Sequence, residues 1–479
     1  MHDERLPLTR REAIARSGRG FGGLALAALL GEAKRAEASP TDSVGYDVLP
    51  KRSHFRPRAT AVIQLFMHGG PSHVDLLDPK PMLNKYDGTP PPGEVTDDEA
   101  RTTYLLASPF KFRKYGESGL EFSEILPNTA RHADEIAVIR SMFGEHRNHE
   151  QAIWLANTGL IRSGRPYVGA WAAYGLGTEN QNLPAYIALP DPKGLPVDGV
   201  RNWSSGWLPP VFQGTPFRAE GVALPNLQPR TPRAPQVERG RMELLSMLNQ
   251  RHKAARPGEL ELDARIASFE LAARMQLSAT DALDLSQETA ATHRLYGLDQ
   301  DKTRSYGRRC LMARRLVERG VRFVQLFMAG QPWDTHNQNV AGTRNCCEQT
   351  DLPIAGLLTD LRQRGLLDTT LIQWGGEFGR TPAAEQRNSN EPGREGRDHH
   401  PYGFSIWLAG GGIKGGQAHG ATDDFGYRAI IDRTQTADLH ATILYLLGLD
   451  HERLTFSHNG RDERLTDVYE ARVIDPLIA

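Results

Sequence analysis

The stretch TAVIQLFMHGG at residues 60–70 is a continuous apolar run that ends in Gly-Gly. Such a run is typical of a strand that is buried on both faces of a parallel sheet. VRFVQLFMAG at residues 321–330 is a near-copy of it, but the match is too short to indicate an internal repeat. We therefore predict two central strands that meet the same packing demands.

Further strand and helix patterns alternate along the chain. Apolar runs at residues 136–142, 369–379 and 404–412 predict three more buried strands. Helical patterns follow His149, end at Gly320 and Gly365, and cover residues 437–449. This alternation predicts an α/β fold with a mostly parallel central sheet and helices on both faces.

The middle of the chain interrupts this alternation. Residues 178–235 are rich in Pro, Gly and Asn, and residues 239–298 are charged and helical in pattern. We interpret residues 178–300 as a loop-rich and helical insertion within one domain that spans residues 39–479.

The N-terminus has the pattern of an export signal. TRREAI at residues 9–14 contains a twin arginine, and the mildly apolar GFGGLALAALL and a small-residue site, AEA at residues 36–38, follow it. These parts predict a twin-arginine signal peptide at residues 1–38 and a periplasmic or extracellular protein. The alternative is an amphipathic helix of the mature domain, which the glycines disfavour. No other stretch is long and apolar enough to predict a membrane span.

Charge and cysteine content exclude some classes of protein. The chain has 57 basic and 58 acidic residues among 479, whereas nucleic-acid binders usually carry a basic surplus. We therefore expect no nucleic-acid partner. Cys310, Cys346 and Cys347 are too few for a disulfide framework and are interpreted as buried or spare thiols.

Polar side chains gather at the ends of the predicted strands. Ligand sites in parallel α/β sheets lie beyond the carboxyl ends of the strands. Four segments offer suitable side chains there: His68, Ser72, His73 and Asp75; Asp334 and His336; Glu377 and Arg380; and Asp398, His399 and His400. Imidazole with carboxylate suits zinc, manganese or iron. The pattern predicts a shared metal site, and the alternative is structural hydrogen bonding and capping.

Two further features suit anions. His146, Asn148 and His149 stand at a predicted helix start, where free backbone N–H groups attract negative charge. Arg380 could bind two oxyanions of a phosphate or sulfate. Alternatively, Asn148 is only a helix cap and Arg380 only a partner for Glu377, and both interpretations stay open.

Several of these motifs together resemble one family. HGGPSHVDLLDPKP, DTHNQN, GEFGRTP, GRDHHPYGFSIWLAGGGIKGG and ATDDFGYRA are similar to the domain-of-unknown-function 1501 family of exported bacterial proteins. The resemblance runs from about Arg56 to the C-terminus. That family is related to the alkaline phosphatase and sulfatase superfamily, so the resemblance implies a metal-centred three-layer α/β sandwich.

The resemblance also implies roles for single residues. Asp334 and His336 resemble the Asp and His of the superfamily's first metal site, and His399 or His400 resembles its late histidine. Glu377 stands for a metal-binding aspartate and His68 for another, whereas Phe378 replaces a histidine ligand. His149 lies ten residues before Gly159, at the nucleophile's spacing, and histidine cannot be the formylglycine precursor of a sulfatase.

We thus expect a metal-dependent hydrolase of phosphate or sulfate monoesters that acts on a small-molecule or glycan ester. The expected cofactor is a divalent ion, with zinc, manganese and calcium as candidates. His149, as nucleophile or proton-transfer group, and Arg380 are the expected catalytic residues. The expected metal-site residues are His68, Asp334, His336, Glu377, His399 and His400. The alternatives are a non-catalytic descendant that binds an anionic glycan or cell-envelope polymer, and an envelope protein with a structural metal.

Overall fold

The two near-identical apolar runs form neighbouring strands in the middle of the main sheet. A computed structural model describes residues 46–91, 102–221, 224, 234–256, 259–386 and 393–479. In it β1 (Ala61–Phe66) pairs in parallel with β8 (Phe323–Phe327) on one side and with β9 (Thr370–Gly375) on the other. Every residue of β1 is buried, and each apolar side chain buried in this way contributes about 1.5–3 kcal/mol to stability. The prediction of two central strands is confirmed.

The main sheet is mostly parallel, as predicted. Among the described residues it has nine strands, with β16 (Thr434–Gln435) beside β5 and the others in the order β13 (Gln417–His419), β5 (Ile136–Phe143), β12 (Phe404–Ala409), β9, β1, β8, β6 (Tyr186–Leu189) and β7 (Thr215–Pro216). β12 runs antiparallel to both of its neighbours, and the other pairs are parallel. The sequence pattern gave no sign of this reversed direction.

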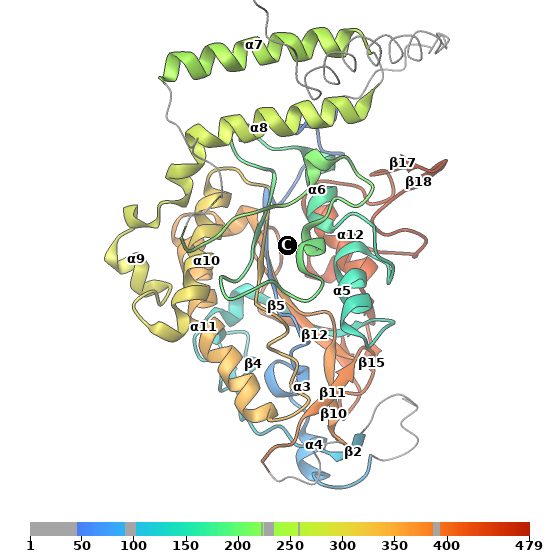
Figure 1. Cartoon of the computed structure of the whole chain (residues 1–479). Coiled ribbons are helices and arrows are strands. Elements are labelled where there is room, and N and C mark those ends of the chain that lie inside the picture. Colours follow the sequence, from blue (N-terminus) through green and yellow to red (C-terminus); the bar gives the residue numbers. More distant parts are fainter. Residues whose placement is uncertain (1–45, 92–101, 222–223, 225–233, 257–258, 387–392) are drawn as a thin grey trace, which may run out of the picture. The chain divides into compact units, whose positions relative to one another are not determined.

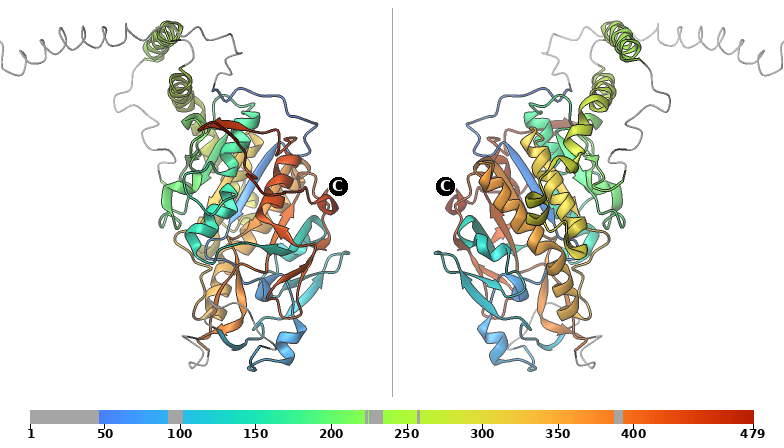
Figure 2. Two further views of the ribbon diagram at one scale, coloured as in Figure 1. Left: turned by 90° about the vertical axis from the view of Figure 1, so that its right-hand side faces the viewer. Right: turned by 90° about the vertical axis from the view of Figure 1, so that its left-hand side faces the viewer.

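Helices cover both faces of the sheet, which makes a three-layer sandwich (Figures 1 and 2). α10 (Asp301–Glu318) and α11 (Asn339–Gln363) pack on the face that receives Ile63 and Leu65. α5 (His149–Thr158), α6 (Val168–Leu176) and α12 (Thr436–Leu446) pack on the face that receives Val62 and Phe66. Alternate residues of β1 therefore supply two separate cores, as the period of two in a strand requires.

The region predicted as an insertion is partly built into the sheet. It contributes β6 and β7, and then α7 (Pro235–Ala254), α8 (Leu260–Leu283) and α9 (Ala290–Leu295). All four residues of β6 are buried, although residues 178–235 were interpreted as surface loops. α8 buries Ala264, Leu271 and Met275.

A second, smaller sheet lies where the central strands end. β10 (Gly379–Glu385) pairs antiparallel with β11 (Arg397–His400) and with β2 (Thr102–Leu105). Arg397 makes a bidentate ion pair with Asp75, with N···O distances of 2.8 and 2.9 Å, and both side chains are fully buried. This pair fixes β11 to α3 (His73–Leu76), the short helix that follows β1. The remaining elements are α3 (His73–Leu76), α4 (Pro81–Lys85), β3 (Phe112–Tyr115), β4 (Leu120–Ser123), β14 (Ala421–Thr422), β15 (Ala429–Ile431), β17 (Phe456–His458) and β18 (Arg461–Glu463).

Two features of the chain concern membranes and export. The predicted signal peptide at residues 1–38 lies outside the described residues. In the described part of the chain, every helix is too short or too polar to cross a bilayer.

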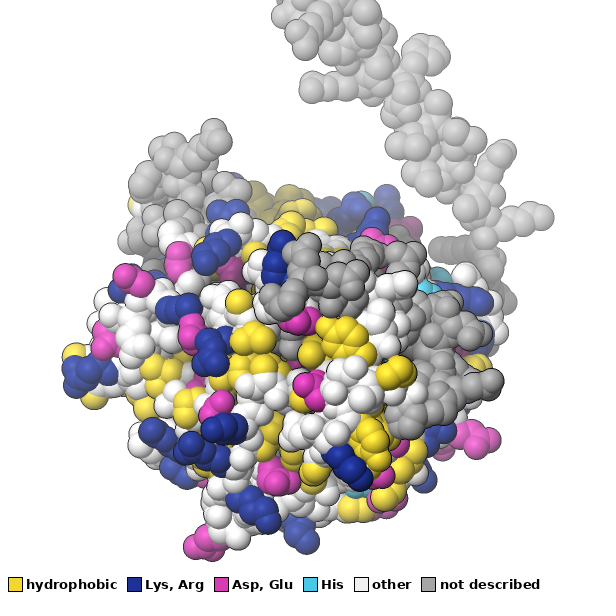
Figure 3. Space-filling model, turned by 90° about the horizontal axis from the view of Figure 1, so that it is seen from below, with side chains coloured by type: hydrophobic (Ala, Val, Ile, Leu, Met, Phe, Trp, Pro, Cys, Tyr) yellow, Lys and Arg dark blue, Asp and Glu magenta, His cyan; other side chains and the backbone are white. Residues whose placement is uncertain are grey.

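Figure 3 shows the face at the lower end of Figure 1, where hydrophobic side chains and both signs of charge are interspersed.

Candidate metal centre

The four predicted segments meet at one edge of the sheet, but not all for the expected reason. His68 follows β1, Asp334 and His336 follow β8, and Glu377 follows β9. The fourth segment, with His399, precedes β12 instead of following a strand. It reaches the same edge because β12 is antiparallel, so its first residue lies beside the last residues of its neighbours.

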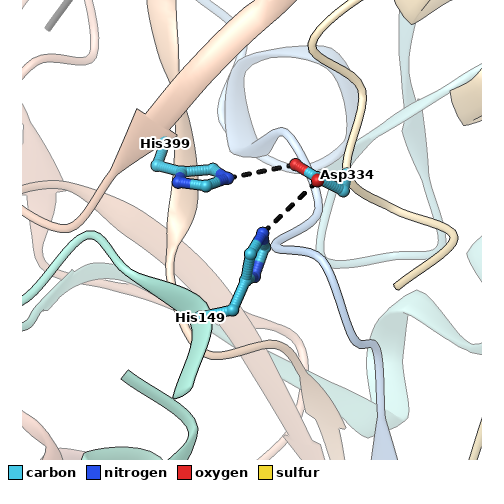
Figure 4. A group of neighbouring side chains, drawn as sticks. All are labelled: His149, Asp334 and His399. Atoms are coloured by element: carbon cyan, nitrogen blue, oxygen red, sulfur yellow. Dashed lines mark hydrogen bonds and ion pairs between the residues drawn. The ribbon is translucent and has the colours of Figure 1, made fainter. Parts of the chain in front are cut away.

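Asp334 is the centre of the resulting cluster. Its Oδ1 lies 3.0 Å from Nε2 of His336 and 3.1 Å from Nε2 of His399, and its Oδ2 lies 3.4 Å from Nε2 of His149. Figure 4 shows Asp334 between His149 and His399. The three imidazoles come from the loop after β8, from β11 and from the first residue of α5. Three histidines far apart in sequence thus direct the same ring nitrogen at one carboxylate.

The spacing of these atoms suits a metal ion. Nε2 of His336 and Nε2 of His399 are 2.9 Å apart, so with Oδ1 of Asp334 they form a triangle with edges of 2.9–3.1 Å. Ligand atoms around a tetrahedral zinc ion are about 3.3 Å apart, given zinc–ligand bonds of about 2.0–2.1 Å. Two groups of converging ligand atoms occur among the described residues: His149, Asp334 and His399, and His336, Asp398 and His399.

Two buried carboxylates orient the imidazoles. Nδ1 of His149 lies 2.7 Å from Oε1 of Glu377, and Nδ1 of His336 lies 2.8 Å from Oε2 of Glu385. A carboxylate that accepts a hydrogen bond from Nδ1–H leaves the Nε2 lone pair of a neutral imidazole for a metal, as in carboxylate–histidine–metal sites. Both lone pairs then point toward Asp334, an arrangement that a cation would stabilise.

Two glycines allow the loops around the cluster to approach closely. Gly69 has φ +110°, and a Cβ there would lie 2.4 Å from the backbone nitrogen of Asp334. A Cβ at Gly396 would lie 2.1 Å from the carbonyl carbon of His336. Gly69, the first glycine of the pair that ends the first apolar run, and Gly396, the glycine before RDHH, are therefore required by the positions of Asp334 and His336.

Arg380 does not have the expected oxyanion-binding role. It is fully buried and donates hydrogen bonds to the backbone carbonyls of Gly69, Gly70 and Arg397. Its ion-pair partner is Asp334, not Glu377. Arg380 therefore holds the loop after β1 against the Asp334 carboxylate. Its guanidinium group leaves no pair of N–H groups directed at a ligand.

The charges of the cluster perturb its pKa values. Burial opposes ionisation of Asp334, but hydrogen bonds from His149, His336 and His399, with the charge of Arg380, hold its pKa well below the usual range. Burial also opposes protonation of His336, yet its bonds to Asp334 and Glu385 raise its pKa to about 9. The pKa of His149 is raised against burial by Asp334 and Glu377. Burial, which Asp334 only partly offsets, lowers the pKa of His399 to about 4.

Three expected metal ligands lie outside the convergent atoms. His400 points to the other side of β11 from His399, and its Nε2 contacts the carbonyl of Tyr427. His68 is fully buried, its ring packs 4.5 Å from that of Phe66 and 5.4 Å from that of Phe327, and burial lowers its pKa to about 4. Glu377, the third, contacts His149 and the backbone N–H of Gly69. Glu377 thus contacts the candidate ligand His149 on the side of the ring away from Asp334.

His149 begins α5, as the sequence predicted, but its surroundings do not favour a nucleophile. One ring nitrogen contacts Glu377 and the other faces Asp334, so the ring matches a metal ligand better. The alternative interpretation, that Asn148 is only a helix cap, is supported by the position of this residue and by nothing else. It is the N-cap residue of α5, and its side chain makes no capping hydrogen bond.

Two further residues of the cluster were not predicted from the sequence. Glu385 orients His336, and Gln331 donates a 2.6 Å hydrogen bond to Oδ2 of Asp334. Glu385 ends TPAAE, an acidic residue directly after two alanines that are themselves buried. The only sequence signal for Glu385 is its position at the end of a short apolar stretch, which by itself does not predict a role at a site.

The donor set fits a divalent ion. It consists of imidazole nitrogens and carboxylate oxygens, which zinc and manganese accept. The His336 side chain is 28 % exposed and that of His149 11 %, so the cluster reaches the surface on one side. The structure is therefore compatible with a metal site that keeps an open position.

Comparisons with solved structures identify distant likenesses. The lipoteichoic acid synthase LtaP from Listeria monocytogenes shares 10% identity at a TM-score of 0.36, over 83% of this chain and 74% of that one. The PsFucS1 sulfatase from Pseudoalteromonas sp. shares 14% at 0.34, over 83% and 69%. The alkaline phosphatase from the Antarctic bacterium TAB5 shares 10% at 0.29, over 81% and 98%. Likenesses of this strength support no statement about activity.

The family model gives a stronger result. No curated protein matches the chain. The model described as "Protein of unknown function (DUF1501)" matches residues 59–478, which include all the strands of the main sheet and every residue of the cluster around Asp334. The chain belongs to the DUF1501 family.

Proposed function

We propose that the protein is a metal-dependent hydrolase of phosphate or sulfate monoesters, with a divalent ion held by Asp334, His336, His399 and His149. The observation that carries this proposal is the convergence of three Nε2 atoms on one carboxylate, with two of the rings oriented by buried glutamates. Structural hydrogen bonding alone would not require three imidazoles to present the same nitrogen to one carboxylate.

The exposure of the cluster favours chemistry over a purely structural metal. Structural zinc sites are closed and fully coordinated, whereas catalytic sites keep one position open. His336 and Asp334 retain 28 % and 13 % of their side-chain exposure. When bound, a divalent ion polarises ester oxygens and lowers the pKa of an attacking water.

The surrounding residues give this site a defined environment. Glu377 and Glu385 hold the Nδ1 protons of His149 and His336, which keeps both rings in the ligand tautomer. The ring of Phe378 packs 5.0 Å from that of His149 and 4.7 Å from that of His399, and so covers one side of the cluster. The N-terminus of α5 begins at His149 itself, where a negatively charged substrate group is favoured.

The second candidate is a non-catalytic protein that binds an anionic glycan. Phe378 supports it, because a phenyl ring in contact with two candidate ligands supplies no further donor for a second ion. The presence of His149 where a Ser, Thr or Cys nucleophile is expected supports it as well. Both candidates use the same cluster to bind an anion, and they differ in turnover.

The test is a screen of aryl phosphates and aryl sulfates with metal-replete wild type, chelated protein and His149→Ala. We expect turnover that chelation abolishes and that His149→Ala lowers by at least about 100-fold, as loss of a group at the reacting centre does. His419→Ala, which removes a half-buried histidine of β13 outside the cluster, is the matched control and should keep wild-type activity. If metal-replete wild type turns over none of the esters, hydrolysis is wrong and glycan binding is favoured.

A further inference from the structure

Helix α7 exposes apolar side chains that have no place in the core. None of its side chains that the structure describes is buried. Val237, Leu244 and Leu248 are 52%, 52% and 50% exposed. Isolated exposed aliphatic residues are ordinary, but several on one exposed helix indicate an interaction surface.

These side chains lie on one side of the helix, together with two arginines. The spacings between Val237, Arg241, Leu244, Leu248 and Arg251 are four, three, four and three residues, which places all five along one line of an α-helix. We call this set the α7 stripe. Arg241 forms an exposed ion pair with Glu238, which at this exposure is weak. The stripe itself contains no carboxylate.

The opposite side of α7 faces the rest of the protein. Met242, Ser246 and Asn249 are half-buried and are likewise four and three residues apart. Lys253 binds Asp263 of α8 at 3.1 Å. Figures 1 and 2 show α7 alongside α8, on the side of α8 away from the sheet. The α7 stripe is therefore directed outward.

A second copy of the chain is a poor occupant for this surface. A parallel pair of stripes places each arginine against its own copy, and an antiparallel pair places each arginine against an aliphatic side chain. Neither stripe supplies a carboxylate to offset these charges. Helix pairs are held by an apolar seam, and two of the five stripe positions here are arginines. Apolar side chains with flanking arginines instead match a lipid surface, where aliphatic groups reach the acyl boundary and guanidinium groups bind headgroup phosphates.

We propose that α7 docks this protein on an anionic lipid surface through Val237, Arg241, Leu244, Leu248 and Arg251. The helix lies in the plane of the interface and does not cross the bilayer, in agreement with its length and polarity. The last turn of α7 places His252 beside Arg251, at the end where the helix dipole favours basic groups. The proposal is independent of the metal centre.

The test is co-sedimentation of the full chain with vesicles of phosphatidylcholine, with and without phosphatidylglycerol. We expect binding only to the anionic vesicles, and weaker binding in high salt. The double variant Leu244→Glu/Leu248→Glu should bind at least about tenfold more weakly, since it removes apolar insertion and adds repulsion. The matched control is Ile430→Glu/Ile431→Glu, which changes two aliphatic residues of β15 that are 58% and 54% exposed and should bind like wild type.

The proposal would be overturned by an absence of binding by wild type, by equal binding to neutral vesicles, or by equal loss in both double variants. A concentration-dependent dimer that Leu244→Glu/Leu248→Glu abolishes would also overturn it, in favour of a second copy. Thermal unfolding of each variant checks that the fold is retained. Arg251→Glu, a single change on the surface, should weaken binding without any change in apolar area.

Discussion

His399 and His400 are neighbours on β11, yet the structure gives them opposite environments. Nε2 of His399 lies 3.1 Å from Asp334 and 2.9 Å from His336, at the partly exposed cluster. Nε2 of His400 contacts the carbonyl of Tyr427 inside the protein, where His73 makes the same kind of contact, 2.9 Å long, with Gly426. Successive side chains of a strand point to opposite faces, so one histidine is available to an ion and the other secures a loop.

This difference separates histidines that stabilise the fold from histidines whose surroundings suit metal binding. Ring nitrogens that contact backbone carbonyls stabilise the fold, as at His73 and His400. Ring nitrogens that converge on a carboxylate, with a second carboxylate behind them, suit metal binding, as at His149 and His336. The type of the nearest partner atom separates the two groups, and proximity in sequence does not.

The largest expected effect comes from removing one of the two neighbours on β11. His399→Ala should weaken metal binding by more than about 100-fold, because loss of a ligand exceeds the roughly 10–100-fold cost of losing its hydrogen-bond partner. His400→Ala should leave metal affinity nearly unchanged but lower the free energy of unfolding by about 1–3 kcal/mol, since it strands a buried carbonyl. Calorimetric titration with zinc or manganese and denaturant unfolding measure the two quantities. Equal loss of metal affinity in both variants would remove the distinction between them.

A smaller effect is expected from the carboxylate behind His336. Glu385→Gln should lower metal affinity by about 10-fold, the lower end of such changes, because the amide can still accept the Nδ1 proton but carries no charge. The matched control is Glu463→Gln. Glu463 is a mostly buried glutamate of the β17–β18 hairpin, and its ion-pair partner is Arg165. Affinity that falls equally in the two variants would mean that Glu385 acts through general stability.

The smallest expected effect is a pH dependence of the metal-free protein. The pKa of His336 is raised to about 9, so its protonated form is favoured in the folded state. The resulting stability is complete below pH 6.5, the ordinary pKa of histidine, and is lost as pH rises through about 9. His399, with a pKa lowered to about 4, titrates below this range.

The melting temperature of chelated protein should therefore fall by a few degrees between pH 6.5 and 9, and less in His336→Gln. Metal affinity should rise over the same range, because binding displaces the His336 proton. A melting temperature that stays constant across this range in wild type would show that Asp334 and Glu385 do not hold a proton on His336.

The sequence predicted the sheet well where the strands are continuous apolar runs. β1, β8, β9 and β5 were predicted because a strand buried on both faces is almost entirely apolar, whereas a half-exposed strand alternates apolar and polar residues. β6 was missed because a short strand between prolines, in PAYIALP, looks like a loop. The direction of β12 depends on how the chain crosses the edge of the sheet, which no local pattern encodes.

For the site, the residue types were predictable and the geometry was not. Asp334, His336 and His149 stand in recognisable motifs. The choice between His399 and His400 depends on the phase of a strand only four residues long, which RDHHPYG does not reveal. Glu385 and the internal bonds of Arg380 arise from the pairing of β10 with β11, a contact between segments that the sequence does not show to be adjacent.

Metal analysis of protein purified without chelator tests the central claim most directly. The samples are wild type, His336→Ala/His399→Ala, and His73→Ala. The last is the control, because the ring of His73 contacts a backbone carbonyl and not the cluster. We predict about one divalent ion per chain in wild type and in His73→Ala, and almost none in the double variant. Full occupancy of the double variant, or a wild type that holds no ion even after incubation with zinc or manganese, would contradict it.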